Sequence, residues 1–442
     1  MSRPAPSHTP TRRHLLATAG AAALAAGLGP TVFVPRARAR SQTLKICQWT
    51  HVVPAFDEWF DQKLVREWGE RHGVKVDVEH LPVSDLQARA AVEVSARNGH
   101  DLFGFLAPPA GYEEHALPLN DVVADCEQRF GKLVPLAHKA TYNPRTKKYF
   151  AFADNWVPNP LHYRTDWWGD VGVKPDSWEA IRDGARKIKE KHGAYAGFGL
   201  APELDSNMSL RGLLWSYGAS EQDETGRVAI NSRATVEAVK LMTAIFKESM
   251  TPEVFRWDPS SNNRFYVYGR GSIIQNAISA LRTTEQQNPD VARKTGLAPP
   301  AAGPVARLAS QHLLHAYVVW RFAANPDLAK RFLVDLVAAS DDAFRTSLFY
   351  NFPAYPRAVA DLRAKLAADK QSPHAYSMLA EAERWSACPG YPGHLTAAIE
   401  EVVNSSIVPH MFARAARGEQ TPETSVRQAE AEMKRIFARW AR

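Results

Sequence analysis

Thr43-Leu-Lys-Ile-Cys-Gln-Trp49 predicts a buried strand, and a helical pattern follows it at once. That helical pattern consists of large apolar residues at helical spacing, which are Phe56, Phe60, Leu64 and Trp68. Gly73 ends the helix, since glycine readily takes the left-handed conformation that closes a helix. A strand followed by an amphipathic helix is the first unit of an α/β sheet.

Two further strands extend this unit. The range 74–78 alternates valine with charged residues, which predicts a strand, and Ser84 is predicted to cap a helix that runs to about Asn98. Asp101-Leu-Phe-Gly-Phe-Leu106 is the third predicted strand. This β-α-β-α-β order predicts a mostly parallel, doubly wound sheet, in which ligands bind beyond the carboxyl ends of the strands. Trp49 and Phe105 are therefore expected at a binding edge.

The rest of the chain also alternates between helices and strands. Helix starts are predicted at Asp176-Ser-Trp-Glu179, Ser232, Asn325-Pro-Asp327 and Thr421-Pro-Glu423, and a strand is predicted at His315–Trp320. A chain of 442 residues is too long for one hydrophobic core, since single cores stop growing near about 250–300 residues. The sequence therefore predicts an α/β protein with two lobes.

Residues 1–39 have the composition of an export signal. Arg12-Arg13 lies before an apolar run from Ala17 to Leu28, and Ala37-Arg38-Ala39 is typical of a cleavage site. The apolar run is too short to span a bilayer. The stretch Thr11-Arg-Arg-His-Leu-Leu16 resembles a twin-arginine signal, and the alternative is a chance arginine pair in an ordinary secretory signal. We expect a soluble protein exported to the periplasm.

The charge of the chain is concentrated in this leader. Residues 1–39 carry +5 of the net charge of +7, so +2 remains for residues 40–442. The composition, with 45% hydrophobic and 23% charged residues, is that of a globular protein. No stripe of Lys and Arg with interleaved aromatic residues is present, which excludes a nucleic-acid partner.

The cysteine pattern predicts neither a metal site nor a cofactor. Cys47, Cys126 and Cys388 are far apart, and none belongs to a CxxC motif. Cys47 lies in an apolar strand after Lys45-Ile46, which lacks the small residues of a lipid-attachment site. A disulfide between Cys126 and Cys388 stays open.

Short motifs occur along the chain in an order that resembles one known family. They are Asp101-Leu-Phe-Gly-Phe105, Pro118-Leu-Asn-Asp121, His162-Tyr-Arg-Thr-Asp166, Lys174-Pro-Asp-Ser-Trp-Glu179, Leu214-Trp-Ser-Tyr-Gly218, Tyr268-Gly-Arg-Gly-Ser-Ile-Ile274 and Arg417-Gly-Glu-Gln-Thr-Pro-Glu423. Their order is similar to that of the family 1 extracellular solute-binding proteins, the maltose-binding-protein-like sugar receptors of ABC importers. His162, Arg164 and Asn276 depart from the residues usual at their positions in the family.

The resemblance implies a two-lobed, periplasmic-binding-protein-like fold of type II, with a hinge and a ligand cleft between the lobes. Lobe 1 would comprise residues 40–153 and 284–350, and lobe 2 residues 154–283 and 351–442. The chain would cross between lobes near 150–155, near 277–283 and near 352–355. The implied partners are a small solute, expected to be a carbohydrate, and an inner-membrane permease, and we expect a monomer.

Candidate ligand-binding residues are aromatic or polar side chains in segments that border the cleft in this family. Trp49 and Phe105 end strands and offer apolar surface to a sugar ring, although each could belong to the core instead. Asn155, Trp156 and Asn159 follow the first crossing, and asparagine provides a donor and an acceptor for vicinal hydroxyls.

Further candidates come from the second lobe and from a late loop. The second lobe contributes Arg211, Trp215, Trp257 and Asn276, and the loop after Pro389-Gly390 contributes Tyr391 and His394. Arg211 and Trp215 lie at helical spacing, so packing within the lobe is the alternative for both.

Other polar pairs are interpreted as structural. His312 and His315 run into an apolar strand without a third metal ligand, and Glu113-Glu114 and Glu400-Glu401 are interpreted as solvated surface charges. No nucleophile-and-base motif of a known hydrolase is present. The predicted function is therefore a binding receptor and not an enzyme. The alternatives left open are a twin-arginine-exported carbohydrate-active enzyme and a receptor for a metal, a polyamine or another polar metabolite.

Overall fold

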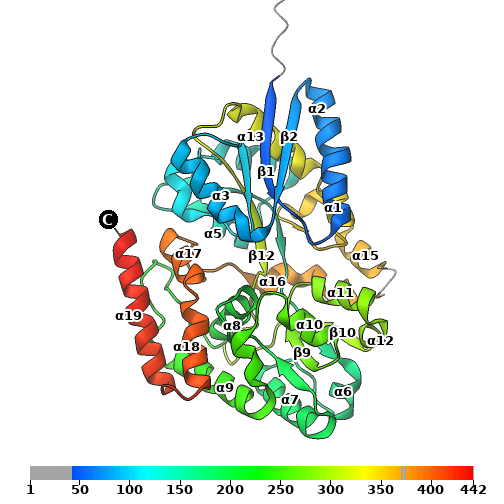
Figure 1. Ribbon diagram of the computed structural model, residues 1–442, viewed down its shortest axis with the longest axis vertical. Coiled ribbons are helices and arrows are strands. Elements are labelled where there is room, and N and C mark those ends of the chain that lie inside the picture. Colours follow the sequence, from blue (N-terminus) through cyan, green and yellow to red (C-terminus); the bar gives the residue numbers. More distant parts are fainter. Residues whose placement is uncertain (1–41, 370–371, 373–374, 442) are drawn as a thin grey trace, which may run out of the picture. The chain divides into compact units, whose positions relative to one another are not determined.

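The structure is a computed structural model that describes residues 42–369, 372 and 375–441. The predicted export signal lies outside the described residues. Two main sheets, each with its own helices and hydrophobic core, make up the described part (Figure 1). Among the helices of the described part, none is long and apolar enough to cross a membrane.

The first sheet has six strands in the order β13-β6-β12-β3-β1-β2. Its strands are β1 (Thr43–Trp49), β2 (Lys75–Leu81), β3 (Leu102–Phe105), β6 (Phe152–Val157), β12 (Leu313–Val319) and β13 (Phe352–Pro353). The strands predicted at the start of the chain are confirmed, and β1 is parallel to β2 and β3. The prediction of a mostly parallel sheet is wrong, because β12 and β6 run antiparallel to their neighbours and the sheet is mixed.

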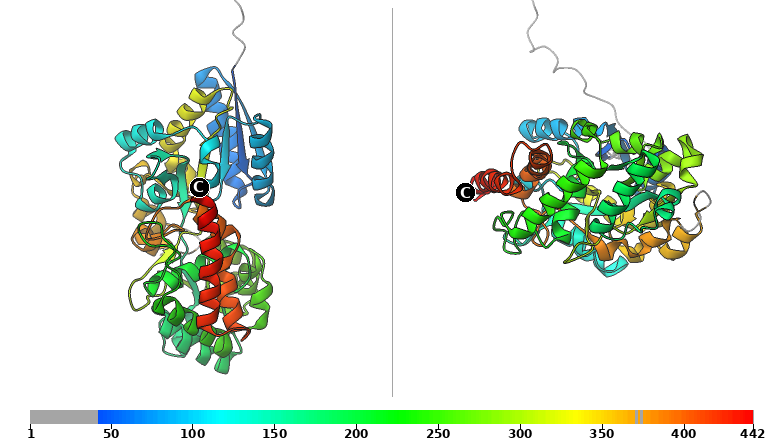
Figure 2. Two further views of the ribbon diagram at one scale, coloured as in Figure 1. Left: turned by 90° about the vertical axis from the view of Figure 1, so that its left-hand side faces the viewer. Right: turned by 90° about the horizontal axis from the view of Figure 1, so that it is seen from below.

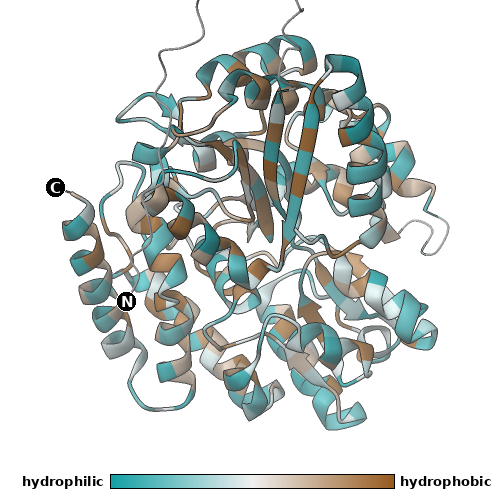
Figure 3. Ribbon diagram, turned by 45° about the horizontal axis from the view of Figure 1, so that its top comes forward, coloured by the Kyte–Doolittle hydropathy of each residue, from teal (hydrophilic) through white to brown (hydrophobic). Residues whose placement is uncertain are grey.

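Helices and short turns surround this sheet. They are α1 (Pro54–Trp59), the π-helical turn η1 (Phe60–Val65), α2 (Arg66–His72), α3 (Val83–Ala96), η2 (Ala110–His115), α4 (Asn120–Phe130), α5 (Pro135–Thr141), α13 (Pro326–Ala338), α14 (Ser340–Thr346), η4 (Pro356–Ala358), α15 (Leu362–Ala367), η5 (Ala375–Glu381) and α16 (Ala382–Trp385). Figure 3 shows that the strands carry much of the apolar colour, whereas the outer helices are largely hydrophilic.

The second sheet has four strands in the order β10-β7-β9-β8. Its strands are β7 (Leu161–Arg164), β8 (Tyr195–Gly197), β9 (Gly271–Gln275) and β10 (Thr295–Ala298). Its helices are α6 (Thr165–Asp170), α7 (Trp178–His192), α8 (Leu204–Ser216), α9 (Arg233–Ser249), η3 (Pro252–Arg256), α10 (Ser261–Val267), α11 (Ser279–Gln287), α12 (Pro289–Ala292), α17 (Ala397–Asn404), α18 (Ile407–Ala416) and α19 (Pro422–Trp440). Helices α18 and α19 pack side by side (Figure 2).

Two short strand pairs complete the secondary structure of the described residues. They are β4 (Tyr142–Asn143) with β5 (Lys148–Tyr149), and β11 (Ala309–Ser310) with β14 (Ser386–Ala387).

Most helix ends follow the local signals in the sequence. Gly73 closes α2 in the left-handed conformation with φ 64°, as predicted. Ser232 and Thr421 accept hydrogen bonds from backbone amides at the starts of α9 and α19, also as predicted. The prediction that Ser84 caps a helix is wrong, because α3 begins at Val83 and the Ser84 hydroxyl donates to Asp85 instead.

The cap of α7 lies one residue later than the capping box Asp176–Glu179 predicts. The hydroxyl of Ser177 accepts from the amide of Ala180 at 3.1 Å, which makes Ser177 the capping residue. Glu179 does not turn back to the helix start, since its carboxylate accepts from the Tyr217 hydroxyl at 2.6 Å.

The chain passes between the two sheets at positions that differ from the predicted crossings. The first passage follows β6 and spans 158–160, just after the predicted 150–155. At the second, Ala277, Ile278 and Leu281 already pack in the core of the six-stranded sheet, whereas the later strand β10 still pairs with β7 in the four-stranded sheet. The third follows α16, since Trp385 still packs in the core of the six-stranded sheet.

Sheet membership also differs from the predicted lobe boundaries at three strands. Strands β6 and β13 pair in the six-stranded sheet, whereas β10 pairs in the four-stranded sheet. The division of the chain into two lobes that move as separate bodies stays a prediction.

Gly184 gives the first testable prediction. The ring of the buried Trp168 packs over α7 at this glycine, and its indole nitrogen donates to the Ser272 carbonyl at 2.9 Å. A Cβ at position 184 would lie 2.3 Å from that ring. We expect Gly184→Ala to destabilise the protein by about 1–3 kcal/mol, because a rigid, well-packed ring must shift.

Thermal unfolding measures this effect. The matched control is Gly169→Ala on α6, where a Cβ would meet nothing within 4 Å. Alanine has the higher helix propensity, so the control should leave the melting temperature unchanged or raise it slightly. Equal melting temperatures for the two variants would contradict the packing described for Trp168.

Candidate functional site

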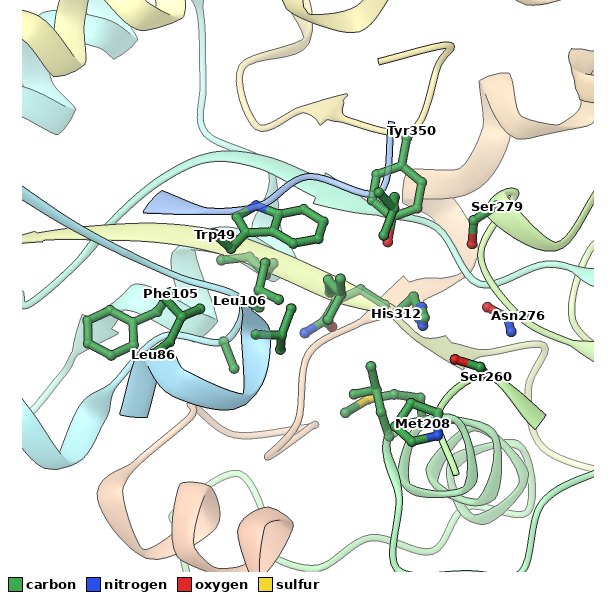
Figure 4. A pocket seen from close by; sticks show the side chains of 18 of the residues that line it. Trp49, Leu86, Phe105, Leu106, Met208, Ser260, Asn276, Ser279, His312 and Tyr350 are labelled. Atoms are coloured by element: carbon green, nitrogen blue, oxygen red, sulfur yellow. The ribbon is translucent and has the colours of Figure 1, made fainter. Parts of the chain in front are cut away.

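One cavity of about 780 Å³ is lined by segments from both sheets and their helices. Trp49 and Phe105 lie at the carboxyl ends of β1 and β3, and Met208 comes from α8. His312 lies directly before β12, and Asn276 lies directly after β9 (Figure 4). The volume falls within the range of about 300–1,000 Å³ that is usual for small-molecule sites. The cavity is therefore the candidate functional site.

Three of the sequence-predicted site residues line this cavity, namely Trp49, Phe105 and Asn276. The side chain of Trp49 is only 4% exposed and that of Phe105 only 1%. Phe105 packs against Phe103 and Trp320, with ring centroids 4.8 and 6.2 Å away. Both predicted aromatic residues therefore lie at the cavity wall, but they present almost no free ring face.

The predicted residues around the first crossing do not line the cavity. Asn155 lies on β6, and its amide group donates to Asp154 at 2.7 Å. Trp156 packs against Phe352 of β13, with ring centroids 5.6 Å apart. The carbonyl oxygen of Asn159 accepts from the Gln275 side chain at 3.1 Å. These contacts tie β6 and the following loop to their neighbours.

Arg211 and Trp215 lie inside the core of the four-stranded sheet. Arg211 forms an ion pair with Glu221, and both side chains are fully buried. A second guanidinium nitrogen of Arg211 donates to the Asn207 side chain at 2.7 Å. The indole nitrogen of Trp215 donates to the Glu221 carboxylate at 3.4 Å. Both residues therefore pack within the lobe, which was the alternative to a role in ligand binding.

Trp257, Tyr391 and His394 also lie outside the cavity lining. Trp257 packs on Phe265 at 5.2 Å between ring centroids, and Tyr391 packs on Trp215 at 5.4 Å. The Nδ1 atom of His394 is 3.1 Å from the Tyr142 carbonyl oxygen. Aromatic content alone therefore did not separate packing residues from residues at the cavity.

A buried polar cluster forms one end of the cavity. The Nε2 atom of His312 lies 3.1 Å from Oδ1 of Asp205, and the Asn276 side chain donates to Oδ2 of Asp205 at 3.2 Å. Asn276 also donates to Asn262 at 2.7 Å and to Asn263 at 2.5 Å. The Nδ1 atom of His312 has no partner within the described residues.

Burial sets the charge state of this cluster. It raises the pKa of Asp205 well above its usual range, and the neighbouring charge of Glu203 adds to the effect. Burial also lowers the pKa of His312 to about 4, so the imidazole is neutral at pH 7. A neutral imidazole can serve as donor or acceptor to a hydroxyl group. The cluster is therefore suited to an uncharged polar ligand.

His312 is a residue whose place in the cavity the sequence did not reveal. Its predicted structural partner, His315, bonds instead to Asp154, with 2.8 Å between Nδ1 and Oδ1. The two histidines thus face different parts of the protein. Within residues 42–369, 372 and 375–441, no group of three or more His, Cys, Asp or Glu side chains could hold a metal ion. Cys126 and Cys388 are buried free thiols, so the possible disulfide is not formed.

The interpretation of Glu400 as a solvated surface charge is wrong. Glu400 is half-buried and lines the cavity, and its carboxylate accepts from the Gly111 amide at 2.8 Å. Burial raises the pKa of Glu400 to about 7. The neighbouring Glu401 points to the surface, where it pairs with Arg439 and accepts from the Trp440 indole at 2.6 Å.

Residues 52–339 match the model of the family described as bacterial extracellular solute-binding protein. A binding protein of Brucella abortus (strain 2308) is 23% identical over 177 residues, which are 39% of this chain and 43% of that protein. A binding protein of Brucella suis biovar 1 (strain 1330) matches with the same values. The chain thus spans less than half the length of these curated relatives.

Solved structures share the fold at low sequence identity. A protein from Synechococcus sp. MITs9220, described as an oligosaccharide periplasmic-binding protein in complex with zinc, has a TM-score of 0.76 and 21% identity. A solute-binding protein from Thermotoga lettingae TMO bound with α-D-tagatose has a TM-score of 0.72 and 17% identity. Maltose-bound MalE3 of T. maritima has a TM-score of 0.72 and 18% identity. Each match covers 90% of this chain and 100% of the other chain, and the predicted two-lobed α/β fold is confirmed.

The Arg211–Glu221 pair gives the second prediction. Glu221→Gln leaves the Arg211 charge buried without its partner, and breaking such a pair costs about 3–5 kcal/mol. We expect a large loss of stability in thermal or urea unfolding. The control is Glu248→Gln, which breaks the partly exposed Arg182–Glu248 pair and should cost less than about 1 kcal/mol. A stable Glu221→Gln variant that loses ligand binding would place this pair in the site instead.

Glu400 gives the third prediction. Its pKa is raised in the folded protein, so the folded state retains a proton that the unfolded state releases. The stability contributed by that proton is present below the unfolded pKa of about 4.5 and is lost as the pH rises through about 7. We expect Glu400→Gln to become progressively more stable than the native protein over that window.

Melting temperatures between pH 4 and 8 measure this difference. Glu401→Gln is the matched control for removing a carboxylate from the same helix. A constant difference between Glu400→Gln and the native protein across the window would contradict the burial of this carboxyl group.

Proposed function

We propose that this protein, which belongs to the family of bacterial extracellular solute-binding proteins, is the receptor of an ABC importer and binds a sugar or oligosaccharide in the cavity. The observation that carries the proposal is the cavity at the carboxyl ends of β1 and β3, lined also by segments next to β9 and β12. Ligands of open α/β sheets bind at such strand ends. The sugar-bound structural relatives support a carbohydrate.

The polar end of the cavity supports recognition of hydroxyl groups. Ser260 and Ser279 line the cavity, and their hydroxyls make no hydrogen bond within the described part of the chain. His312 lies beside them with an unpaired Nδ1 atom. A ligand hydroxyl can donate to one of these groups and accept from another. The two lobes would close on the ligand by a hinge motion and present the closed form to a permease.

The distribution of charge favours a sugar over a metal ion or a polyamine. The charged side chains in the cavity lining are Arg282 and Glu400. Arg282 forms ion pairs with Glu285 and Asp369, so its charge is compensated. A polyamine receptor would need several acidic groups at the ligand, and a metal receptor would need clustered ligating groups.

Binding without turnover is the proposed role, because Glu400 is the single carboxyl group that the described part of the chain contributes to the cavity lining. Glu203 and Asp205 are absent from the lining, and Glu203 accepts from the backbone amides of Asp205 and Ser206, both at 2.6 Å. A glycosidase needs two carboxyl groups that flank the scissile bond. Glu203 instead caps the first turn of α8, and the Asp205 carboxylate bonds to His312 and Asn276.

Export places this receptor outside the cytoplasm. We propose that residues 1–39 act as a twin-arginine-type signal and are removed, and that the mature protein works in the periplasm as a monomer. Its partners are then the solute and an inner-membrane permease.

His312 and Ser279 give the fourth prediction. We expect His312→Ala and Ser279→Ala each to weaken binding of the cognate sugar about five- to tenfold, since each removes about one hydrogen bond of roughly 1 kcal/mol. Isothermal titration against a panel of mono- and disaccharides first identifies the sugar and then measures the variants. Ser279→Ala should leave the melting temperature unchanged, because its hydroxyl bonds to no described residue.

The control for these variants is His192→Ala on the surface of α7, where His192 bonds to Asp170 at 2.8 Å. It should bind the sugar as the native protein does. If His312→Ala and Ser279→Ala both bound the sugar with native affinity, the polar end of the cavity would not be part of the binding site.

A further inference from the structure

We propose that the ligand is amphiphilic: an uncharged, hydroxyl-bearing head group that carries an aliphatic chain, as in an alkyl glycoside. This inference rests on the proposed function and specifies its substrate class. It follows from the kind of surface that the cavity presents, which has Asn276, Ser260 and Ser279 at one end and apolar side chains at the other (Figure 4).

Exposed aliphatic side chains are concentrated at the cavity. Large apolar residues are rarely exposed without a reason when they form a patch. The described part of the chain has seven that are strongly exposed, and three of them line this cavity: Val52 at 53%, Val83 at 52% and Leu348 at 39%. The partly buried Leu106 continues this surface (Figure 4). A ligand that covers these aliphatic side chains would gain binding free energy by removing their hydrocarbon surface from water.

The cavity offers little surface for stacking on a sugar ring. A pyranose ring packs on the open face of an aromatic side chain. Trp49 is the single tryptophan of the cavity lining, and it is only 4% exposed. Phe105 is 1% exposed and Tyr350 is 3% exposed. The accessible apolar surface of the cavity is therefore aliphatic. An aliphatic surface suits a flexible hydrocarbon chain better than it suits a second sugar ring.

The polar groups lie at the opposite end of the cavity from part of this apolar surface. Figure 4 shows Asn276, Ser260 and Ser279 on one side and Leu86 and Leu106 on the other. The polar side holds the neutral His312 imidazole, and the charge of Arg282 at the lining is compensated by Asp369. A head group with hydroxyls and no net charge fits this end, and the chain then extends toward Leu106.

A chain-length series tests the proposal. Methyl, butyl and hexyl β-D-glucosides, and the matching β-D-maltosides, are titrated into the full mature protein below their micelle concentrations. Each methylene removed from water contributes about 0.8 kcal/mol, so affinity should rise up to about fourfold per methylene for at least one head group. Affinity that does not change with chain length overturns the amphiphilic ligand.

Val83 and Val92 provide a matched pair of variants, because both are exposed valines on α3 and only Val83 lines the cavity. We expect Val83→Ser to weaken binding of the hexyl glycoside about fivefold and to leave the methyl glycoside unchanged. Val92→Ser, at a side chain that is 63% exposed, should change neither. If the two substitutions had equal effects on binding, the hydrocarbon chain of the glycoside would not lie against Val83.

The outcomes separate this inference from the proposed function. Binding of methyl glycosides or free sugars without a chain-length effect leaves the sugar receptor standing and removes the amphiphilic ligand. Absence of binding by every glycoside and free sugar tested overturns both.

Discussion

The hydrogen bond between His312 and Asp205 is the interaction on which the site depends. His312 lies at the start of β12 in the six-stranded sheet, and Asp205 lies in the first turn of α8 beside the four-stranded sheet. The bond therefore joins segments that belong to different cores. Both side chains are almost fully buried, where a polar group without a partner is costly. Each residue thus depends on the other as a hydrogen-bond partner, and this hydrogen bond fixes the position of His312 in the cavity wall.

Burial also explains why this link is polar without being a strong ion pair. The low-dielectric surroundings disfavour the charged form of either residue, so the pKa of Asp205 is raised and that of His312 is lowered. A fully charged pair at this position would pay a large desolvation penalty. Asn276 reduces the cost by donating a hydrogen bond to Asp205. The neutral His312 imidazole and the Asn276 amide therefore hold Asp205 in place and leave hydroxyl groups as the natural ligands.

The sequence predicted local features well and long-range contacts poorly. Gly73, Ser232 and Thr421 mark helix ends because a single residue's conformation or hydroxyl determines each end. The pairing of β10 with β7 was not predictable, since it joins residues about 130 positions apart in the sequence by backbone hydrogen bonds that carry no sequence signal. The contact between His312 and Asp205 was missed for the same reason. Trp156, Trp215 and Trp257 were candidates for the site because large aromatic residues serve cores and sugar sites equally well.

The burial of these tryptophans has a consequence for specificity. Aromatic faces and hydroxyl-bonding carboxylates let a sugar site distinguish ring geometry, whereas aliphatic walls distinguish ligands mainly by the amount of apolar area they bury. Val52, Val83 and Leu348 provide such walls here. The polar cluster around Asp205 must then supply the geometric selection, because its three bonded side chains cannot move independently. Selectivity for the head group and affinity from the chain would consequently reside at different ends of one cavity.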